Sequence, residues 1–254
     1  MRMVTESTRR VNEAVRKLLP WLERRPKPWI EEQSEFWYRV FEFVFTPIFR
    51  YWIRFFRAIG AENVPATGGV FVLCNHTSGM DPFILGYALP HRRINGPGKV
   101  ELFKNPVFGF LMRKIGIFPL HRDSLDAAAV RTMVSLYRAG RLVVIYPEGT
   151  RSETGDLLPF LPGVTRLLIK LEAQIVPAGV AGGNELLPIH ARIPRRNTPV
   201  VAAFGSPFDL SRFYSRRPTP EMLDEATKLI HQRVEEQLAT AREERARLLA
   251  LANR

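Results

Sequence analysis

Short apolar runs alternate with longer amphipathic stretches over most of the chain. Five apolar runs have the length of buried strands, and they cover residues 70–75, 116–120, 141–147, 175–180 and 200–205. The stretches between them have helical periodicity and predict helices at residues 83–89, 105–115, 124–140 and 163–173. Because strands that alternate with helices favour parallel pairing, the pattern predicts an α/β fold with a largely parallel sheet flanked by helices.

A long helical pattern closes the chain from Thr219 onward. Thr219 is a suitable N-cap residue, and Pro220 suits the first position of a helix. Charges of both signs alternate through the following residues, as on a helix that is partly solvated. We therefore expect one long C-terminal helix and assign it, together with the sheet, to an α/β domain of residues 61–254.

Residues 36–59 carry a different pattern, in which aromatic residues are interrupted by charges. Their longest charge-free run is far shorter than the ~20 residues that a membrane-spanning helix needs. Pro47 predicts a break, and Arg50, Arg54 and Arg57 recur at helical spacing, which together indicate an amphipathic pair of aromatic helices. Such a pair suits a membrane interface, although a core helix whose arginines extend to water is the alternative.

Composition narrows the classes of function. The 254 residues are 46% hydrophobic, enough for a folded core, and we expect residues 1–60 to form a helical membrane-associating segment ahead of it. The net charge of +12 indicates an anionic partner, which is a membrane surface, a nucleic acid or a phosphorylated substrate. Cys74 is the single cysteine, so the chain cannot form an internal disulfide. The first residues lack the apolar core of a secretory signal, and we expect the protein on the cytosolic side.

The stretch NHTSGMDP follows the strand at residues 70–75 and contains two residues of chemical interest. His76 and Asp81 are five residues apart, so they would diverge on a helix but can meet in a loop that leads into one. A carboxylate that holds an imidazole is the arrangement of a general base. Asp81 before Pro82 also suits a helix N-cap, and capping is therefore the alternative.

A second polar stretch, YPEGTRS at residues 146–152, follows another predicted strand. Gly149 permits close approach of the backbone, and Arg151 offers a planar guanidinium that suits a phosphate group. Because chemistry in parallel sheets gathers at the carboxyl ends of the strands, we expect this stretch and His76 to belong to one site.

These stretches resemble the glycerolipid acyltransferase family with the HxxxxD motif, which includes the PlsC-like 1-acylglycerol-3-phosphate acyltransferases. NHTSGMD is similar to the NHxxxxD block of the family, GIFPLHR to its second block, YPEGTRS to its third and IVPAGV to its fourth. The blocks occur in the family order, and KVELFKNPVFGFLMRKIG between the first two is also similar. The resemblance extends over about residues 35–210.

The resemblance implies transfer of a fatty acyl group from acyl-CoA or acyl-carrier protein to a hydroxyl of a lysophosphatidic-acid-like acceptor in phospholipid synthesis. His76 would be the general base, and Asp81 would orient it. Arg122 and Arg151 match family positions linked to the acceptor phosphate, and Lys99 is a third candidate cation. The implied acyl donor is a substrate, and neither a cofactor nor a metal is implied.

Four further residues are implied in substrate binding: Ser78, Glu148, Gly149 and Thr150. Gly149 would let a backbone amide support the oxyanion that develops during acyl transfer. The chain departs from the family at residues 160–163, where FLPG replaces a lysine-rich block, so the acceptor headgroup and the acylated position stay open. The acyl-chain length, the donor and the oligomeric state are open as well.

Other classes of function remain as alternatives. A serine hydrolase at Ser78 would need the GxSxG pattern, which is absent, and the remaining histidines form no pair with metal-ligand spacing. A non-enzymatic basic protein that binds an anionic membrane or nucleic acid is the alternative from a different class, although no nucleic-acid-binding motif is present and we expect no nucleic acid partner. An acyltransferase for another lysolipid or a glycolipid is the other alternative. We expect membrane lipids as partners, and a peripheral or monotopic protein on the cytoplasmic face of the cell membrane.

Overall fold

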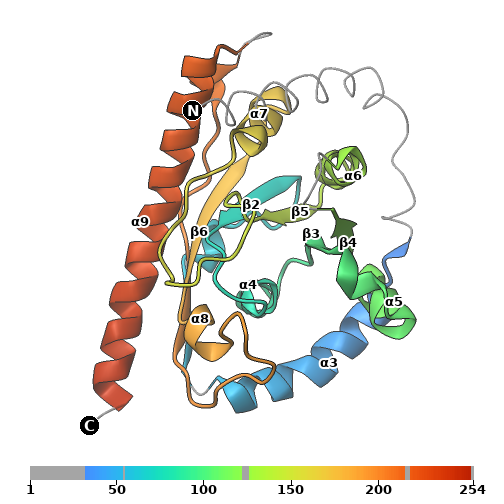
Figure 1. Ribbon diagram of the computed structural model, residues 1–254, viewed down its shortest axis with the longest axis vertical. Helices are drawn as coiled ribbons and strands as arrows, with labels where there is room; N and C mark the ends of the chain where they lie inside the picture. Colours follow the sequence, from blue (N-terminus) through green and yellow to red (C-terminus); the bar gives the residue numbers. More distant parts are fainter. Residues whose placement is uncertain (1–31, 54, 122–125, 215–217, 253–254) are drawn as a thin grey trace.

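The computed structural model describes residues 32–53, 55–121, 126–214 and 218–252, and helices and strands are labelled as in Figure 1. The strands are β1 (Phe56–Ile59), β2 (Val70–Cys74), β3 (Ile94–Lys99), β4 (Ile117–Leu120), β5 (Leu142–Ile145), β6 (Ile175–Ala181) and β7 (Val200–Phe204). The α-helices are α3 (Glu35–Trp52), α4 (Asp81–Ala88), α5 (Pro106–Lys114), α6 (Ala127–Arg138), α7 (Pro162–Lys170), α8 (Gly183–Leu186) and α9 (Pro220–Ala252). Short 3-10 helices are η2 (Ala61–Asn63), η3 (Val100–Phe103) and η4 (Ser211–Phe213).

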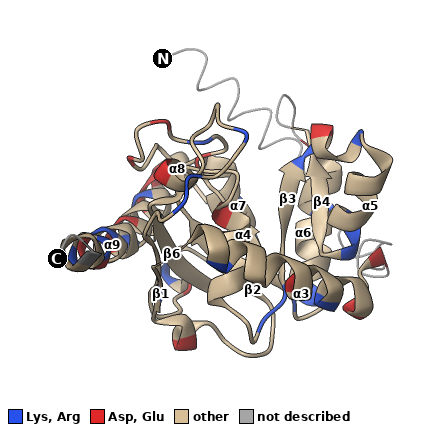
Figure 2. Ribbon diagram, turned by 90° about the horizontal axis from the view of Figure 1, so that it is seen from below, with Lys and Arg blue, Asp and Glu red and all other residues tan. Residues whose placement is uncertain are grey.

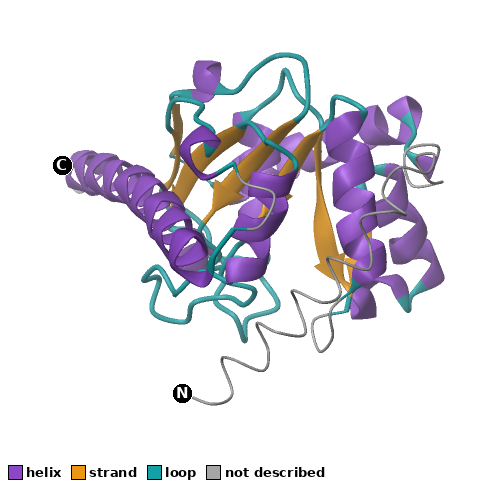
Figure 3. Ribbon diagram, turned by 90° about the horizontal axis from the view of Figure 1, so that it is seen from above, coloured by secondary structure: helices purple, strands orange, loops and turns teal. Residues whose placement is uncertain are grey.

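The strands of the described residues form a seven-stranded sheet in the order β1-β7-β6-β2-β5-β3-β4. All neighbouring strands pair in parallel except β6 and β7, which are antiparallel. The strands occupy the centre of the molecule, with helices on both sides (Figure 3). The prediction of an α/β fold with a largely parallel sheet is therefore confirmed, and the five predicted strands all appear within a few residues of their expected ends.

Strand β2 shows why the central strands read as continuous apolar runs, because all five of its residues are buried. Val70, Val72 and Cys74 enter the core that contains residues of α3 and α4. Phe71 and Leu73, which alternate with them, enter the opposite core with residues of α6, α7 and α9. A strand that is covered on both faces needs apolar residues at every position.

The long C-terminal helix is confirmed as α9, which runs along one side of the molecule (Figure 1). The Thr219 hydroxyl caps it by accepting a hydrogen bond from the Met222 amide at 3.3 Å. Its buried positions recur every three to four residues: Leu223, Ala226, Ile230, Val234, Leu238 and Ala241. Gly179 of β6 allows the helix to approach closely, since a Cβ atom there would lie 2.3 Å from the Leu238 nitrogen. On its outer side, basic and acidic residues are mixed (Figure 2).

The predicted pair of N-terminal helices is wrong, because residues 35–52 form the single helix α3 and residues 56–59 form strand β1. Pro47 lies inside α3 and removes only one backbone hydrogen bond, while Phe49 and Ile53 anchor the end of the helix in the core. Strand β1 pairs with β7, so the sheet begins before the predicted boundary at residue 60.

The three arginines of this segment do not lie together on one helical face. Arg50 is exposed on α3, whereas Arg57 lies on β1 and forms an ion pair of 2.6 Å with Glu244 of α9. Arg54 lies outside the described residues. Of these three positions, Arg50 therefore keeps the exposed helical placement that the sequence predicts.

Strand β3 was missing from the sequence prediction because it contains Gly96, Pro97 and Gly98, which normally mark turns. It pairs with β4 through Gly96–Lys99, and with β5 only through Ile94 and Asn95. Partial pairing on one side leaves room for a proline in the strand. Among the described helices, none combines the length and the apolar content that crossing a bilayer requires.

Candidate active site

The loop after β2 is fixed to the neighbouring strand by Asn75. The Asn75 side-chain amide donates to the Val180 carbonyl oxygen at 3.0 Å, and its oxygen accepts from the Val180 amide at 2.7 Å. Asn75 is 1% exposed, so both bonds are shielded from water. Because Val180 lies on β6, these bonds hold the start of the loop at the carboxyl end of the sheet.

His76 and Asp81 meet, as the sequence predicts. His76 Nδ1 lies 2.9 Å from Asp81 Oδ2, and the same oxygen accepts hydrogen bonds from the backbone amides of Thr77 at 2.7 Å and Ser78 at 2.8 Å. The His76 side chain is 8% exposed and the Asp81 side chain is fully buried. Asp81 is the first residue of α4 and its side chain turns back toward the loop, while α4 has no side-chain cap. The alternative in which Asp81 serves as an N-cap is therefore excluded.

The stretch after β5 closes over the other side of His76. The Tyr146 ring stacks on the imidazole, with ring centroids 4.0 Å apart and planes inclined by 17°. The Ser152 amide donates to the His76 carbonyl oxygen at 2.8 Å. Because β5 pairs in parallel with β2, with Ile145 opposite Leu73, the two stretches leave the sheet side by side. They form one site, which is the arrangement expected from the sequence.

Glu148 is bound to the backbone on both sides. Its Oε1 accepts from the His76 amide at 2.6 Å, and its Oε2 accepts from the Leu158 amide at 2.8 Å. Burial raises the pKa of Glu148 to about 7, against the two amide hydrogen bonds that favour the charged form, and the nearby Asp81 raises the pKa further. Both oxygens are engaged within the protein, so Glu148 holds the backbone of His76 in place.

Gly149 and Thr150 form the turn that follows. Gly149 has φ = 71°, and a Cβ atom there would lie 2.6 Å from Leu161 Cδ1, so both conformation and space favour glycine. The Gly149 amide donates to the Tyr146 carbonyl oxygen at 3.1 Å and is therefore not directed toward an oxyanion. Thr150 is exposed beside it.

The three candidate phosphate-binding residues differ in their position relative to His76. Arg151 is half-buried beside the His76 loop, since a Cβ atom on Gly79 would lie 3.8 Å from Arg151 Nη1. Lys99 is exposed at the carboxyl end of β3, which is two strands from β2 and thus roughly 10 Å across the sheet. Arg122 lies outside the described residues.

Ser78 has a structural role in the loop. It is fully buried, and its hydroxyl donates to the Leu187 carbonyl oxygen at 2.9 Å and accepts from the Met80 amide at 3.2 Å. The site also contains a residue that the sequence reading missed, Gly183, where a Cβ atom would lie 2.5 Å from Asp81 Oδ1. The glycine pair after the fourth block was its only signal in the sequence.

Within the ranges that the structure describes, no group of three or more histidine, cysteine, aspartate or glutamate side chains is placed to hold a metal ion. The chemical groups of the site are thus a buried imidazole–carboxylate pair, a half-buried guanidinium and the backbone that positions them. This set is suited to removing a proton from a hydroxyl group near an anionic substituent.

Comparisons with known proteins identify similar sequences and a similar fold. The sequence model of the family described as Acyltransferase matches residues 56–181. The 1-acyl-sn-glycerol-3-phosphate acyltransferase of Bacillus subtilis is 29% identical over 178 residues, which cover 69% of this chain and 84% of the relative. The enzyme of the same name from Borreliella burgdorferi is 30% identical over 129 residues, which cover 49% of this chain and half of the relative. The crystal structure of the 1-acyl-sn-glycerophosphate acyltransferase PlsC from Thermotoga maritima matches 72% of this chain and 71% of its own, with a TM-score of 0.58 and 25% identity.

Proposed function

Because this chain belongs to the acyltransferase family, we propose that it transfers a fatty acyl group from a thioester to a hydroxyl of a lysophosphatidic-acid-like acceptor in phospholipid synthesis. The observation that carries the proposal is the buried contact of 2.9 Å between His76 Nδ1 and Asp81 Oδ2. The related proteins are named for the same reaction. The donor in this proposal is acyl-CoA or acyl-carrier protein.

The contact supports different proposed roles for the two imidazole nitrogens. An ionised Asp81 accepts a hydrogen bond from Nδ1–H, which leaves the lone pair of Nε2 free to take a proton. The two backbone amides that also bind Asp81 Oδ2 keep the carboxylate in this orientation. His76 is therefore the general base, and Asp81 stabilises the imidazolium that forms.

The reaction proceeds by addition and elimination. The acceptor hydroxyl gives its proton to His76 Nε2 while its oxygen attacks the carbonyl carbon of the thioester. The C–S bond of the resulting tetrahedral intermediate then breaks, and the leaving thiolate takes the proton from the imidazolium. The products are an ester and a free thiol, and His76 returns to its neutral form.

Arg151 is assigned to the phosphate group of the acceptor, because its half-buried guanidinium lies next to the loop that carries His76. A planar guanidinium binds a phosphate through two parallel hydrogen bonds, which also orients the acceptor. Lys99, at the same edge of the sheet, adds a second positive charge.

We also propose that the protein works at the cytoplasmic face of the membrane as a peripheral or monotopic protein. One side of α3 exposes apolar side chains: Phe36, Phe43, Val44, Ile48 and Tyr51. An exposed apolar patch of this kind marks an interaction site, and the acceptor and product of the proposed reaction are membrane lipids. Arg39 and Arg50, both exposed on α3, suit anionic headgroups.

Release of free thiol from an acyl thioester, measured with and without lysophosphatidic acid, tests the proposed reaction. His76→Ala should lower kcat by about 10²-fold or more, since the hydroxyl then loses its proton acceptor. His190→Ala is the matched control, because His190 is an exposed histidine in the loop after α8. A well-folded His76→Ala protein with near-normal turnover would contradict the mechanism.

A further inference from the structure

The loop between α8 and β7, residues 187–199, is basic and exposed. It contains three arginines and one histidine but no aspartate or glutamate. Its exposed basic and aliphatic side chains are His190, Arg192, Ile193, Arg195 and Arg196. Figure 2 shows blue segments of this loop beside α8. Glu185, the carboxylate just before the loop, pairs with Arg245 of α9 at 2.5 Å, so the positive charge of the loop is not balanced by it.

This basic loop lies at the edge of the sheet that carries the candidate active site. It follows β6, which pairs in parallel with β2, so both strands end at this edge. The Ser78 hydroxyl donates to the Leu187 carbonyl oxygen at 2.9 Å, which joins the start of the basic loop to the loop that carries His76. In Figure 1 the basic loop is the orange segment that runs from α8 past the end of α3. A surface that binds the basic loop therefore also lies at the edge where His76 is held.

The basic loop is also joined to the end of α3. The Asn197 amide donates to the Trp52 carbonyl oxygen at 3.1 Å, and the Arg196 guanidinium lies over the Tyr51 ring, 4.1 Å from its centroid. Such a contact between a cation and an aromatic face is attractive. Tyr51 is 57% exposed and belongs to the apolar side of α3 that is proposed to meet the membrane. The basic loop and this side of α3 thus form one continuous surface.

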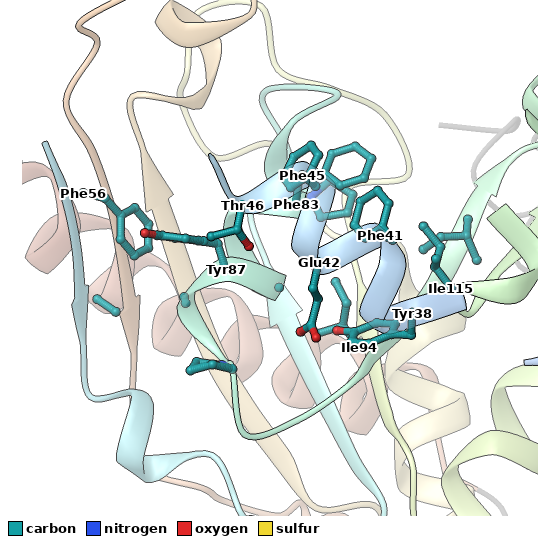
Figure 4. A pocket seen from close by; sticks show the side chains of 16 residues that line it. Tyr38, Phe41, Glu42, Phe45, Thr46, Phe56, Phe83, Tyr87, Ile94 and Ile115 are labelled. Atoms are coloured by element: carbon teal, nitrogen blue, oxygen red, sulfur yellow. The ribbon is translucent and has the colours of Figure 1, made fainter. Parts of the chain in front are cut away.

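The opposite side of α3 is turned toward the protein. Phe41 and Phe45 point inward, where they line a pocket that α3 shares with α4 (Figure 4). Phe45 also lies against Phe83 of α4, with ring centroids 4.9 Å apart. The fold therefore fixes which side of α3 can meet a membrane, and the basic loop adjoins that side.

We propose that the basic loop binds anionic phospholipids and, together with α3, holds the edge that carries His76 against the bilayer. Arginine binds a phosphate group through two parallel hydrogen bonds, and each cation near an anionic lipid surface strengthens binding by about fivefold. Ile193, which is exposed between Arg192 and Arg195, gains by entering the boundary between headgroups and acyl chains. An exposed aliphatic side chain beside an exposed apolar helix favours a lipid surface over a nucleic acid, whose backbone offers only phosphate contacts. The inference rests on the proposed action at a membrane.

Fluorescence quenching tests whether the basic loop meets the lipid. A fluorophore that responds to its surroundings is attached to Ile193→Cys, and Cys74 does not interfere because it is fully buried. On vesicles of phosphatidylcholine and phosphatidylglycerol, brominated lipid should quench this fluorophore about twofold, since it then lies near the acyl chains. The same fluorophore on Gln232→Cys is the control, because Gln232 is exposed in the half of α9 that lies away from α3 (Figure 1). Its fluorescence should not change.

Removal of charge tests the arginines against a control that loses the same net charge. Arg192→Gln together with Arg195→Gln should weaken binding to these vesicles by about 25-fold, which is about fivefold for each charge. Lys228→Gln together with Arg233→Gln changes two exposed residues in the same half of α9 as the control fluorophore. This pair should weaken vesicle binding by no more than about twofold, because charges farther from the surface than a screening length contribute little. All four residues are exposed, so both double variants should keep the thermal stability of the wild type.

Three results would overturn the inference: equal loss of vesicle binding by the two double variants, no quenching at residue 193 on vesicle-bound protein, and a preference of the basic loop for nucleic acid. The last would be seen as duplex DNA that binds the wild type as tightly as the vesicles do and binds the Arg192→Gln/Arg195→Gln variant more weakly. Vesicle binding is measured without acyl transfer. A protein that binds vesicles through the basic loop but releases no thiol would therefore contradict the proposed reaction alone.

Discussion

His76 is held by one nearby residue and two residues that are distant in sequence, and both its ring and its backbone are fixed. Asp81 lies within hydrogen-bonding distance of Nδ1, and Tyr146 stacks on the ring. Glu148, 72 residues away, accepts a hydrogen bond from the backbone amide of His76. A base that must accept a proton at one nitrogen gains from such fixed geometry, because misplacement of the reacting atoms slows the reaction.

Arg151→Lys tests the assignment of the acceptor phosphate at the scale of one side chain. Lysine keeps the charge but loses the two parallel hydrogen bonds of the guanidinium, so KM for lysophosphatidic acid should rise about tenfold. KM for the thioester should change little. Monoacylglycerol, which has no phosphate, is the control acceptor. A change in the thioester kinetics alone would place Arg151 at the other substrate.

Glu148 should make stability depend on pH. Its pKa is raised from 4.5 to about 7 in the folded protein, so between these values the folded chain keeps a proton that the unfolded chain has lost. The stabilising contribution is present below about pH 4.5 and is lost as the pH rises through about 7. The free energy of unfolding should therefore fall by roughly 2–3 kcal/mol between pH 5 and pH 8, relative to that of Glu148→Gln.

Denaturant unfolding of the two proteins at several pH values measures this difference. Glu148→Gln loses an acceptor for one backbone amide, but that loss is independent of pH. Only the change of the free energy of unfolding with pH is therefore diagnostic. If the free energies of unfolding of the two proteins differ by a constant amount from pH 5 to pH 8, Glu148 does not titrate in this range.

At the scale of one element, α3 has two apolar sides with different roles. Phe49 is 1% exposed and packs in the core, whereas Phe43 is 83% exposed and Ile48 is 50% exposed. Replacing both Phe43 and Ile48 with serine should weaken binding to anionic vesicles by at least tenfold, because each large apolar side chain contributes about 1.5–3 kcal/mol when fully buried. Co-sedimentation with vesicles measures the effect.

Leu251→Ser is the matched control for this element, since Leu251 is 66% exposed at the end of α9. It should leave vesicle binding unchanged. The α3 variant should keep its thermal stability, because substitutions of exposed residues usually change stability by no more than about 0.5 kcal/mol. Undiminished vesicle binding by a stable α3 variant would place the membrane contact elsewhere on the protein.

At the scale of the whole molecule, the net charge of +12 should make the membrane contact sensitive to salt. Binding to anionic vesicles should weaken as the ionic strength rises from about 0.05 M to about 0.5 M, because the screening length falls below ~10 Å. Vesicles of zwitterionic lipid should bind less at low salt and show little salt dependence. Duplex DNA that binds as tightly as anionic vesicles would favour the alternative of a general anion-binding protein.

Much of this architecture could be predicted because it is encoded locally. The apolar runs of β2 and β5 through β7, the periodicity of α9 and the capping pair of Thr219 and Pro220 are properties of neighbouring residues. Strands β1 and β3 escaped prediction for the opposite reason. Phe56–Ile59 continues an aromatic run that looks helical, and Gly96–Gly98 looks like a turn, so pairing with β7 and β4 decides both.

The sequence by itself determined which chemical groups this protein brings to the carboxyl end of a parallel sheet, because His76, Asp81 and Glu148 directly follow or closely trail recognisable strands. Only the tertiary structure decided what each group touches. Asp81 binds the imidazole and two loop amides instead of capping α4, and Glu148 binds the backbone of His76 instead of facing a substrate. The inward and outward aromatic residues of α3 look alike in the sequence. Contacts between segments far apart in the chain depend on the order of the strands in the sheet, and local periodicity does not encode that order.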